Sequence, residues 1–229
     1  MIKIEKKIIA IGGGGFIHQS DESLDQFVLD QSKKLSNKIG FLATASKDDE
    51  KKISSFYKRF KDTDSELSHF NLTSNIDGFA EWLLKKDIIY VGGGNTFFML
   101  EIWKKNNLDY VFKNAYEKGI ILSGVSAGAV CWFEWILSDS TGHGLKPLKG
   151  INLISGSCTP HSSNIERINQ FQFDIKNDKL PNGIAIDDGV AVVFIDGKPT
   201  EVYSSRKNHK AYYLDKNKKI NLKEYIEKL

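Results

Sequence analysis

The sequence predicts an α/β fold: a three-layer α/β/α sandwich built around a mostly parallel sheet, as a single domain over residues 1–229. Short β-branched runs that are apolar throughout recur at residues 7–11, 38–44, 87–91 and 119–125. Such runs suit strands that are buried on both faces of a parallel sheet. Longer amphipathic segments lie between them, and this alternation is typical of a sheet covered by helices on both sides.

The amphipathic segments predict the helices. They cover residues 21–35, 48–60, 75–86 and 95–118. In the first segment Leu24, Phe27, Val28 and Leu35 fall near helical spacing, and Asp21 is expected to cap its start. We expect the last segment to break into two helices near Asn106.

The C-terminal third has a different pattern. Residues 142–150 contain glycines and a proline and predict a loop, and residues 163–177 predict a helix. Strand-like runs follow at residues 184–189, 190–197 and 200–214. Turn signals such as Asp196-Gly197 separate them, so we expect β-hairpins that extend or flank the sheet.

Composition narrows the class of protein. The net charge of +3, from 32 basic and 29 acidic residues, gives no reason to expect a nucleic acid or a membrane as partner. The two cysteines, Cys131 and Cys158, have no metal-ligand spacing, so we expect no metal site. The N-terminus lacks the pattern of a secretion signal, which favours a cytoplasmic protein.

Three glycine clusters follow predicted strands, at residues 12–15, 92–95 and 124–128. Loops at the carboxyl ends of parallel strands gather at one edge of a sheet, where open α/β folds bind ligands. The first cluster does not fit a dinucleotide fingerprint, because Ile17 and His18 stand where the last glycine is required. It indicates a tight turn beside a neighbouring strand, a loop bordering an active site, or, least well supported, a nucleotide site.

The second cluster, 92-GGGN-95, lies between a strand and a helix. Asn95 is well placed as the helix N-cap. The unpaired backbone amides of Gly93 and Gly94 suit a developing negative charge, so we expect these three residues to border an oxyanion or a substrate. Helix capping alone is the alternative.

The third cluster, 124-GVSAG-128, fits the G-x-S-x-G pattern of a nucleophile elbow. A serine on such a sharp turn needs small neighbours, and the amide of Ala127 can then face an oxyanion. Ser126 is therefore the candidate nucleophile. Tight packing between a strand and a helix is the alternative explanation for the small residues.

A serine hydroxyl needs a base to become a good nucleophile. We prefer His161, because Pro160 restrains the backbone just before it. His143, between two glycines, is the alternative. His18 borders the first glycine loop and is a candidate for contact with substrate, whereas His69 and His209 are expected to be surface or packing residues.

The third catalytic group is an acid that orients the histidine. We prefer Asp139, which follows the helix expected to begin at Ala127 and is free to fold back. Glu134 would lie about two turns along that helix and would point away from the serine. Asp187 and Asp188, at the end of a strand-like run, are further alternatives.

Together these motifs resemble a known family. The stretch 91-VGGGNTFFML-100, followed by 124-GVSAGAVCWFEW-135, then 138-SDS-140 and 160-PH-161, is similar to the serine peptidases related to peptidase E and cyanophycinase. The resemblance covers most of the chain, up to about residue 195. It implies a fold like the class I glutamine amidotransferases, with a serine in place of their cysteine.

The resemblance also implies a site and an activity. It implies a triad of Ser126, His161 and Asp139, and an oxyanion hole made by Ala127 with Gly93 or Gly94, without metal or cofactor. The implied substrate is a small peptide, such as a dipeptide with an N-terminal aspartate. The chain departs from the family pattern at 130-VCW-132 and at Ser162, which affects the expected substrate preference rather than the nucleophile.

Two other classes of function stay open at this point. An esterase or other acyl hydrolase would use the same triad, and a non-catalytic amidotransferase-like protein would bind a ligand without turnover. Arg167, the nearest basic residue after His161, is either a carboxylate-binding group or a solvated helix residue. The sequence leaves the oligomeric state open, and a homodimer is one candidate.

Overall fold

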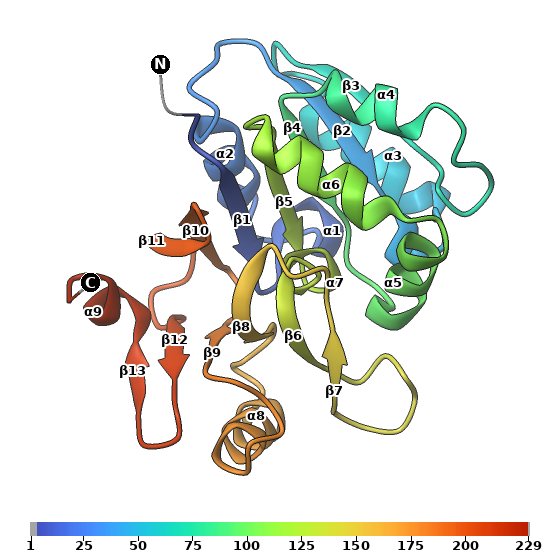
Figure 1. Cartoon of the computed structure of the whole chain (residues 1–229). Coiled ribbons are helices and arrows are strands. Elements are labelled where there is room, and N and C mark those ends of the chain that lie inside the picture. The colour runs from blue at the N-terminus through green and yellow to red at the C-terminus, as the bar shows by residue number, and fades with distance from the viewer. Residues whose placement is uncertain (1–3, 229) are drawn as a thin grey trace.

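Residues 4–228 are described by a computed structural model in which helices flank two β-sheets (Figure 1). The larger sheet has the strand order β11 (Lys198–Ser204), β10 (Val190–Ile195), β1 (Lys7–Ile11), β5 (Ile121–Val125), β4 (Ile88–Val91), β2 (Lys38–Leu42) and β3 (Glu66–His69). Neighbouring strands from β1 to β3 run parallel, and β10 and β11 join as an antiparallel hairpin. The predicted α/β sandwich with a mostly parallel sheet is confirmed.

Helices cover both faces of this sheet. One face carries α1 (Gly15–His18), α2 (Ser23–Asp30) and α3 (Glu50–Phe60); the other carries α4 (Phe79–Leu84), α5 (Thr96–Lys105) and α6 (Leu108–Glu117). Aromatic rings fill both interfaces: Phe56 of α3 stacks on Phe41 with ring centroids 5.0 Å apart, and Trp103 packs 4.3 Å from Phe112. The predicted break between two helices is confirmed at Asn106 and Asn107.

A second sheet lies below the first in Figure 1. Its C-terminal strands fall in the predicted runs at residues 184–189 and 200–214, whereas its strands between residues 133 and 159 were not expected from the sequence. Its order is β13 (Lys219–Asn221), β12 (Ala211–Leu214), β9 (Gly183–Ile186), β8 (Ile154–Thr159), β6 (Phe133–Ser138) and β7 (Lys146–Lys149). Helix α8 (Ile165–Lys176) packs Phe171 and Ile175 against one face. Buried residues of the other face, Ile136 and Ile184 among them, join the core of the larger sheet.

The helix after the serine is much shorter than expected. Helix α7 (Ala127–Val130) is a single turn, and strand β6 begins three residues later at Phe133. The aromatic and β-branched residues of 133-FEWIL-137 favour a strand over a helix. Glu134 is therefore a strand residue, and the prediction that it lies two helical turns beyond Ala127 is wrong.

The first long helix is also shorter than expected, since α2 ends at Asp30. Leu35 is fully exposed, so it is not part of the buried helix face. Asp21 does not cap the helix, because the N-cap is Glu22. The carboxylate of Asp21 binds Arg206 instead. The remaining elements are the 3-10 turn η1 (Thr44–Ser46) and helix α9 (Leu222–Ile226).

The two sheets bring several loops to one place. The loops that follow β1, β4 and β5 all leave the carboxyl edge of the larger sheet. The segments after β8 and β9 reach the same place from the second sheet, where Asp188 forms an isolated parallel bridge with Gly13. None of the helices within residues 4–228 has the length and apolar character needed to span a bilayer.

Candidate active site

Ser126 occupies a strained turn between β5 and α7. Its backbone has φ 56° and ψ −114°, in a region that residues other than glycine rarely adopt. The Ser126 amide donates to Ile11 O at 2.9 Å, and this bond ties the turn to the neighbouring strand. Glycine is required at Gly128, because a Cβ there would overlap the carbonyl of Val91. The sharp turn predicted from G-x-S-x-G is therefore present.

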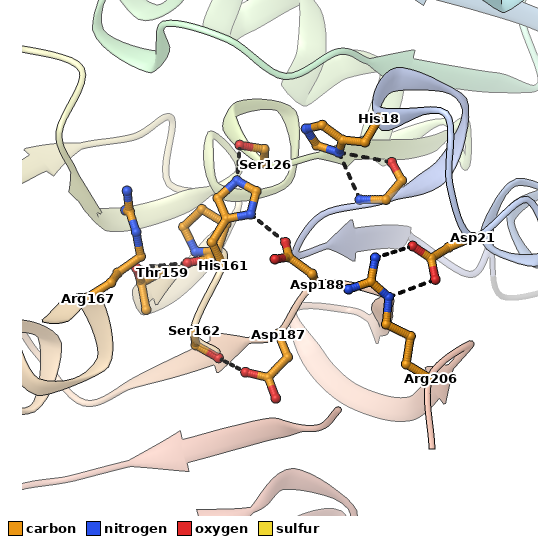
Figure 2. Close-up of polar contacts among 12 residues, drawn as sticks. His18, Asp21, Ser126, Thr159, His161, Ser162, Arg167, Asp187, Asp188 and Arg206 are labelled. Carbon is orange, nitrogen blue, oxygen red and sulfur yellow. Dashed lines mark hydrogen bonds and ion pairs between the residues drawn. The ribbon is translucent and has the colours of Figure 1, made fainter. Parts of the chain in front are cut away.

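His161 meets the serine directly. Its Nε2 lies 2.8 Å from Ser126 Oγ (Figure 2). His161 follows β8 through Pro160 and has a left-handed φ of 52°, while its carbonyl accepts a hydrogen bond from the Asn164 amide at 3.0 Å. This local turn fixes the imidazole toward the serine. The predicted pairing of Ser126 with His161 matches the structure.

The other ring nitrogen of His161 contacts Asp188. Oδ1 of Asp188 lies 2.5 Å from His161 Nδ1. This hydrogen bond lowers the pKa of Asp188 below its usual value, although partial burial opposes the shift. An ionised carboxylate at this nitrogen holds the tautomer in which Nε2 is free to accept a proton from the serine.

The prediction that Asp139 orients His161 is wrong. Asp139 lies on the rim of the cavity, with 64% of its side chain exposed, and pairs with Arg167 at 2.9 Å. The reason is the short α7: because the chain continues as strand β6, residue 139 emerges on the Arg167 side of the cavity. Glu134, on that same strand, accepts from the Gly156 amide at 3.3 Å.

Asp187 and Asp188 are adjacent but face different partners. Asp187 accepts from Ser162 Oγ at 2.6 Å and from the Lys210 amide at 2.9 Å. Its hydrogen bonds therefore hold the loop that follows His161 and do not reach the imidazole. From the sequence, Asp139 was preferred to Asp188. The position of Asp188 at the end of a strand-like run was nevertheless a usable signal.

The first glycine loop packs directly against this acid. The carbonyl of Gly13 accepts from the Gly189 amide at 2.7 Å. A Cβ at Gly13 would overlap Asp188 Oδ1 and would stand 2.9 Å from the His161 ring. The first cluster is thus both a tight turn beside another segment and a border of the site. Its third interpretation, a nucleotide site, has no support here.

The second glycine loop passes close to the serine. A Cβ built at Gly93 would lie 3.7 Å from Ser126 Oγ. Over residues 4–228, the amides of Gly93 and Gly94 donate no hydrogen bond to the protein, and Ala127, as the first residue of α7, has no intrahelical acceptor. Asn95 is the helix N-cap: its Oδ1 accepts from Phe98 N, and its Nδ2 donates to Ser140 O. Its amide group is thus occupied in structure and not turned to the serine.

A cavity of about 300 Å³ opens in front of Ser126 and His161. It is also lined by His18, Lys52, Gly93, Gly94, Thr96, Val130, Leu137, Ser138, Asp139, Pro160 and Arg167. The lining is rich in cations and poor in apolar surface. This favours a small, polar ligand with negative charge.

Of the other histidines, His18 lines the cavity and His69 does not. His18 lines the cavity as expected: its Nδ1 accepts from the Gly14 amide at 2.8 Å, and its ring centroid lies 5.9 Å from that of His161. Burial, followed by the nearby His161, lowers the pKa of His18. His69 bonds the Tyr57 hydroxyl away from the cavity, and His143 is not among the lining residues.

In the described part of the chain, no cluster of three or more His, Cys, Asp or Glu side chains is arranged to hold a metal ion. Cys131 and Cys158 are both buried, and burial raises the pKa of each thiol well above its usual value.

Comparison with known proteins identifies the family. The model of peptidase family S51 matches residues 8–202. The chain belongs to peptidase family S51. It is 41% identical over 210 residues to an uncharacterized peptidase of Bacillus subtilis, covering 90% of this chain and 91% of that one. An uncharacterized peptidase of Pasteurella multocida is 26% identical over 159 residues, covering 65% of this chain and 77% of its own.

Solved structures support the fold of this S51 peptidase. A peptidase from an acI-B1 actinobacterium superposes with a TM-score of 0.71 at 15% identity, covering 94% of this chain and 93% of its own. A putative peptidase E protein from Listeria monocytogenes superposes with a TM-score of 0.64 at 22% identity, covering 88% and 98%. The expected resemblance to peptidase E is confirmed, and the chain is a peptidase.

Proposed function

We propose that this S51 peptidase is a serine peptidase of small peptides, with Ser126 as nucleophile, His161 as general base and Asp188 as the acid that orients the histidine. The observation that carries the proposal is the continuous hydrogen-bonded chain from Ser126 Oγ through the His161 ring to Asp188 Oδ1, with distances of 2.8 Å and 2.5 Å. Nucleophile, base and orienting acid in this order are the parts that serine acyl transfer requires.

In the proposed reaction, Ser126 Oγ attacks the peptide carbonyl while His161 Nε2 takes the hydroxyl proton. The negative charge on the carbonyl oxygen is stabilised by the backbone amide of Ala127 together with that of Gly93 or Gly94. His161 then gives its proton to the leaving amine as the peptide C–N bond breaks. Water, activated by the same imidazole, hydrolyses the acyl-enzyme and restores the serine.

The cavity supports short substrates with a carboxylate. Its volume of about 300 Å³ is at the small end of ligand sites, which suits a dipeptide. Arg167 lines it with only 11% of its side chain exposed, and its bond to Asp139 leaves further guanidinium N–H groups for an anion. We therefore infer a preference for an N-terminal aspartate, with Arg167 contacting the aspartate side chain.

Hydrolysis of a dipeptide library by the wild type and by Ser126→Ala tests the proposal. We expect Asp-X dipeptides to be cleaved most rapidly, and we expect Ser126→Ala to lose at least about 10³-fold in kcat while keeping the wild-type unfolding midpoint. Full activity of Ser126→Ala on any peptide that the wild type cleaves would disprove the assignment of the nucleophile.

Short-chain esters belong in the same library, because the same three residues can hydrolyse an ester. Rapid ester cleavage without peptide cleavage would identify an esterase instead. Arg167→Met is the matched test of substrate preference: we expect a higher KM for Asp-X dipeptides and little change for Ala-X dipeptides.

A further inference from the structure

Lys52 is a basic residue of the cavity for which the proposed reaction so far has no role. It lies on α3, far from the serine in sequence, and its Nζ donates to Gly93 O at 2.8 Å. Burial lowers the pKa of its ammonium. In the described part of the chain, Lys52 Nζ hydrogen-bonds Gly93 O and has no other hydrogen-bond or ion-pair partner. Partial burial of an ammonium costs free energy, and one hydrogen bond to a backbone carbonyl offsets only part of that cost. This suggests that the hydrogen bond has a function.

The acceptor of Lys52 belongs to the peptide unit beside the nucleophile. In a trans peptide the C=O of one residue and the N–H of the next point in opposite directions. With Gly93 O held by Lys52, the N–H of Gly94 must therefore point away from Lys52. This N–H donates to nothing in the described chain, and Gly93 itself approaches Ser126 closely.

The next peptide unit is held from the other side. The Asn95 amide donates to Ala45 O at 2.7 Å, directly after Gly94. Gly94 has φ 152°, and a Cβ there would overlap the carbonyl of Ala45, so the backbone passes too close to admit a side chain. Two hydrogen bonds thus bracket the Gly93–Gly94 peptide. Glycines have a large conformational freedom, and without such anchors the peptide is free to rotate.

We propose that Lys52 is a positioning residue for the oxyanion hole: its bond to Gly93 O fixes the Gly93–Gly94 peptide so that the Gly94 N–H serves, with the Ala127 N–H, as a donor to the substrate oxyanion. The inference rests on the proposed function. When the Ser126 Oγ–C bond forms, the carbonyl π electrons move to oxygen and the Gly94 N–H stabilises them. If the peptide rotated, the Gly93 carbonyl would turn toward that charge and repel it.

Lys52→Met tests this role, because methionine keeps much of the side-chain length but has no N–H donor. We expect kcat to fall about 10- to 100-fold, less than for outright loss of an oxyanion donor, with KM for a dipeptide changed less than about two-fold. Rates are normalised to serine sites titrated with a fluorophosphonate. Lys51→Met is the matched control, since Lys51 is the exposed neighbour on α3, and we expect its kinetics to be those of the wild type.

Chemical rescue separates positioning from a merely structural effect. Alkylation of Lys52→Cys with 2-bromoethylamine restores an ammonium at nearly the original length. Cys131 and Cys158 are both fully buried, so treated wild type serves as the control. We expect kcat to rise at least about 10-fold on alkylation of the variant, which a folding defect would not produce.

The outcomes distinguish this inference from the proposed function. An unchanged kcat in Lys52→Met, or a change confined to KM for acidic peptides, would overturn the positioning role and would make Lys52 a substrate-binding group. If Lys52→Met does not fold, Lys52→Leu, which also has no N–H donor, replaces it with the same expected loss of kcat. Wild-type hydrolysis that persists in Ser126→Ala would instead overturn the proposed function itself.

Discussion

Substitution of Asp188 and substitution of Asp139 are expected to have different effects on catalysis. In the proposed mechanism an uncharged amide at position 188 would stabilise the wrong imidazole tautomer, in which Nε2 carries the proton. Asp139 contacts Arg167 and not the histidine, so its charge does not act on the nucleophile.

We therefore expect Asp188→Asn to lower kcat by about 10³- to 10⁴-fold, while Asp139→Asn keeps kcat within about three-fold of the wild type. Steady-state hydrolysis of one good dipeptide substrate measures both. Comparable losses in the two variants would mean that the acid has been assigned to the wrong residue.

Asp25 is a second carboxylate with an unusual environment, and it affects stability rather than catalysis. It is fully buried beneath the first glycine loop, where it accepts from the Phe16 amide and pairs with Arg59 at 3.0 Å. Burial is the largest influence on it and raises the pKa of Asp25 to about 6, although Arg59 favours the charged form.

This pKa has a defined consequence for stability. Because the pKa of Asp25 in the folded chain exceeds its unfolded value of about 3.9, the folded chain holds the extra proton between these values. The contribution of Asp25 to stability therefore decreases as pH rises from about 4 to about 6, by at most about 3 kcal/mol, and is constant above that range.

Urea unfolding of the wild type and Asp25→Asn at pH 4.5 and pH 7 measures this contribution. We expect the variant to gain stability relative to the wild type at the higher pH; a pH-independent difference would contradict the raised pKa.

Among the elements, the glycine loop after β1 packs against Asp188. Only glycine fits at position 13, because Asp188 and the His161 ring fill the space that a Cβ would need. The glycines of this loop are visible in the sequence. Their packing against Asp188, however, is a contact between segments about 175 residues apart in the chain, and a local sequence pattern cannot predict it.

Gly13→Ala tests this packing. We expect it to displace Asp188 and to lower kcat at least about 100-fold, with the protein still folded. The control is Gly142→Ala, at a glycine of left-handed φ where a Cβ meets nothing within 4 Å. That substitution should cost about 1 kcal/mol of stability and leave kcat unchanged. Wild-type activity of Gly13→Ala would show that the acid tolerates displacement.

Sequence patterns located the elements that carry the serine and the histidine, because both depend on short local signals. The strand–turn–helix context placed Ser126, and a proline before a turn placed His161. The sequence did not single out the aspartate that contacts His161 for a physical reason: adjacent residues of an extended segment face opposite sides, so 187-DDG-189 does not reveal which aspartate faces the imidazole. Strands β6 and β8 of the second sheet were not expected, because the helix predicted to begin at Ala127 extended over β6 and polar residues in β8 hide its burial.

At the scale of the whole molecule, the site is assembled from both ends of the chain. Arg206, in the segment between β11 and β12, binds Asp21 near the N-terminus through two hydrogen bonds of 2.9 Å and 2.6 Å (Figure 2). The hydrogen bonds from Arg206 lower the pKa of Asp21 to about 2. The stem of Arg206 also lies against Gly189, and Ser205 Oγ lies within hydrogen-bond distance of both Asp21 Oδ1, at 2.8 Å, and Gly189 O, at 3.0 Å. This ion pair therefore supports the loop that carries Asp188.

Arg206→Met should loosen that support. We expect a loss of about 1–3 kcal/mol in the free energy of unfolding, because Asp21 keeps a largely buried charge without its partner. We also expect a fall in kcat of about 10-fold through the displaced acid. Lys207→Met, at an exposed neighbour, is the control for removal of a charge. A drop in stability with an unchanged kcat would show that the ion pair does not influence Asp188.

Covalent labelling tests whether Ser126 is a nucleophile that His161 and Asp188 activate. The wild type, Ser126→Ala and Asp188→Asn are incubated with a fluorophosphonate, followed by intact-mass measurement and peptide mapping. We expect one adduct per chain on Ser126 in the wild type, none in Ser126→Ala, and labelling at least about 100-fold slower in Asp188→Asn. An adduct on another residue would show that Ser126 is not the nucleophile, and equal labelling rates in the wild type and Asp188→Asn would show that Asp188 does not activate it.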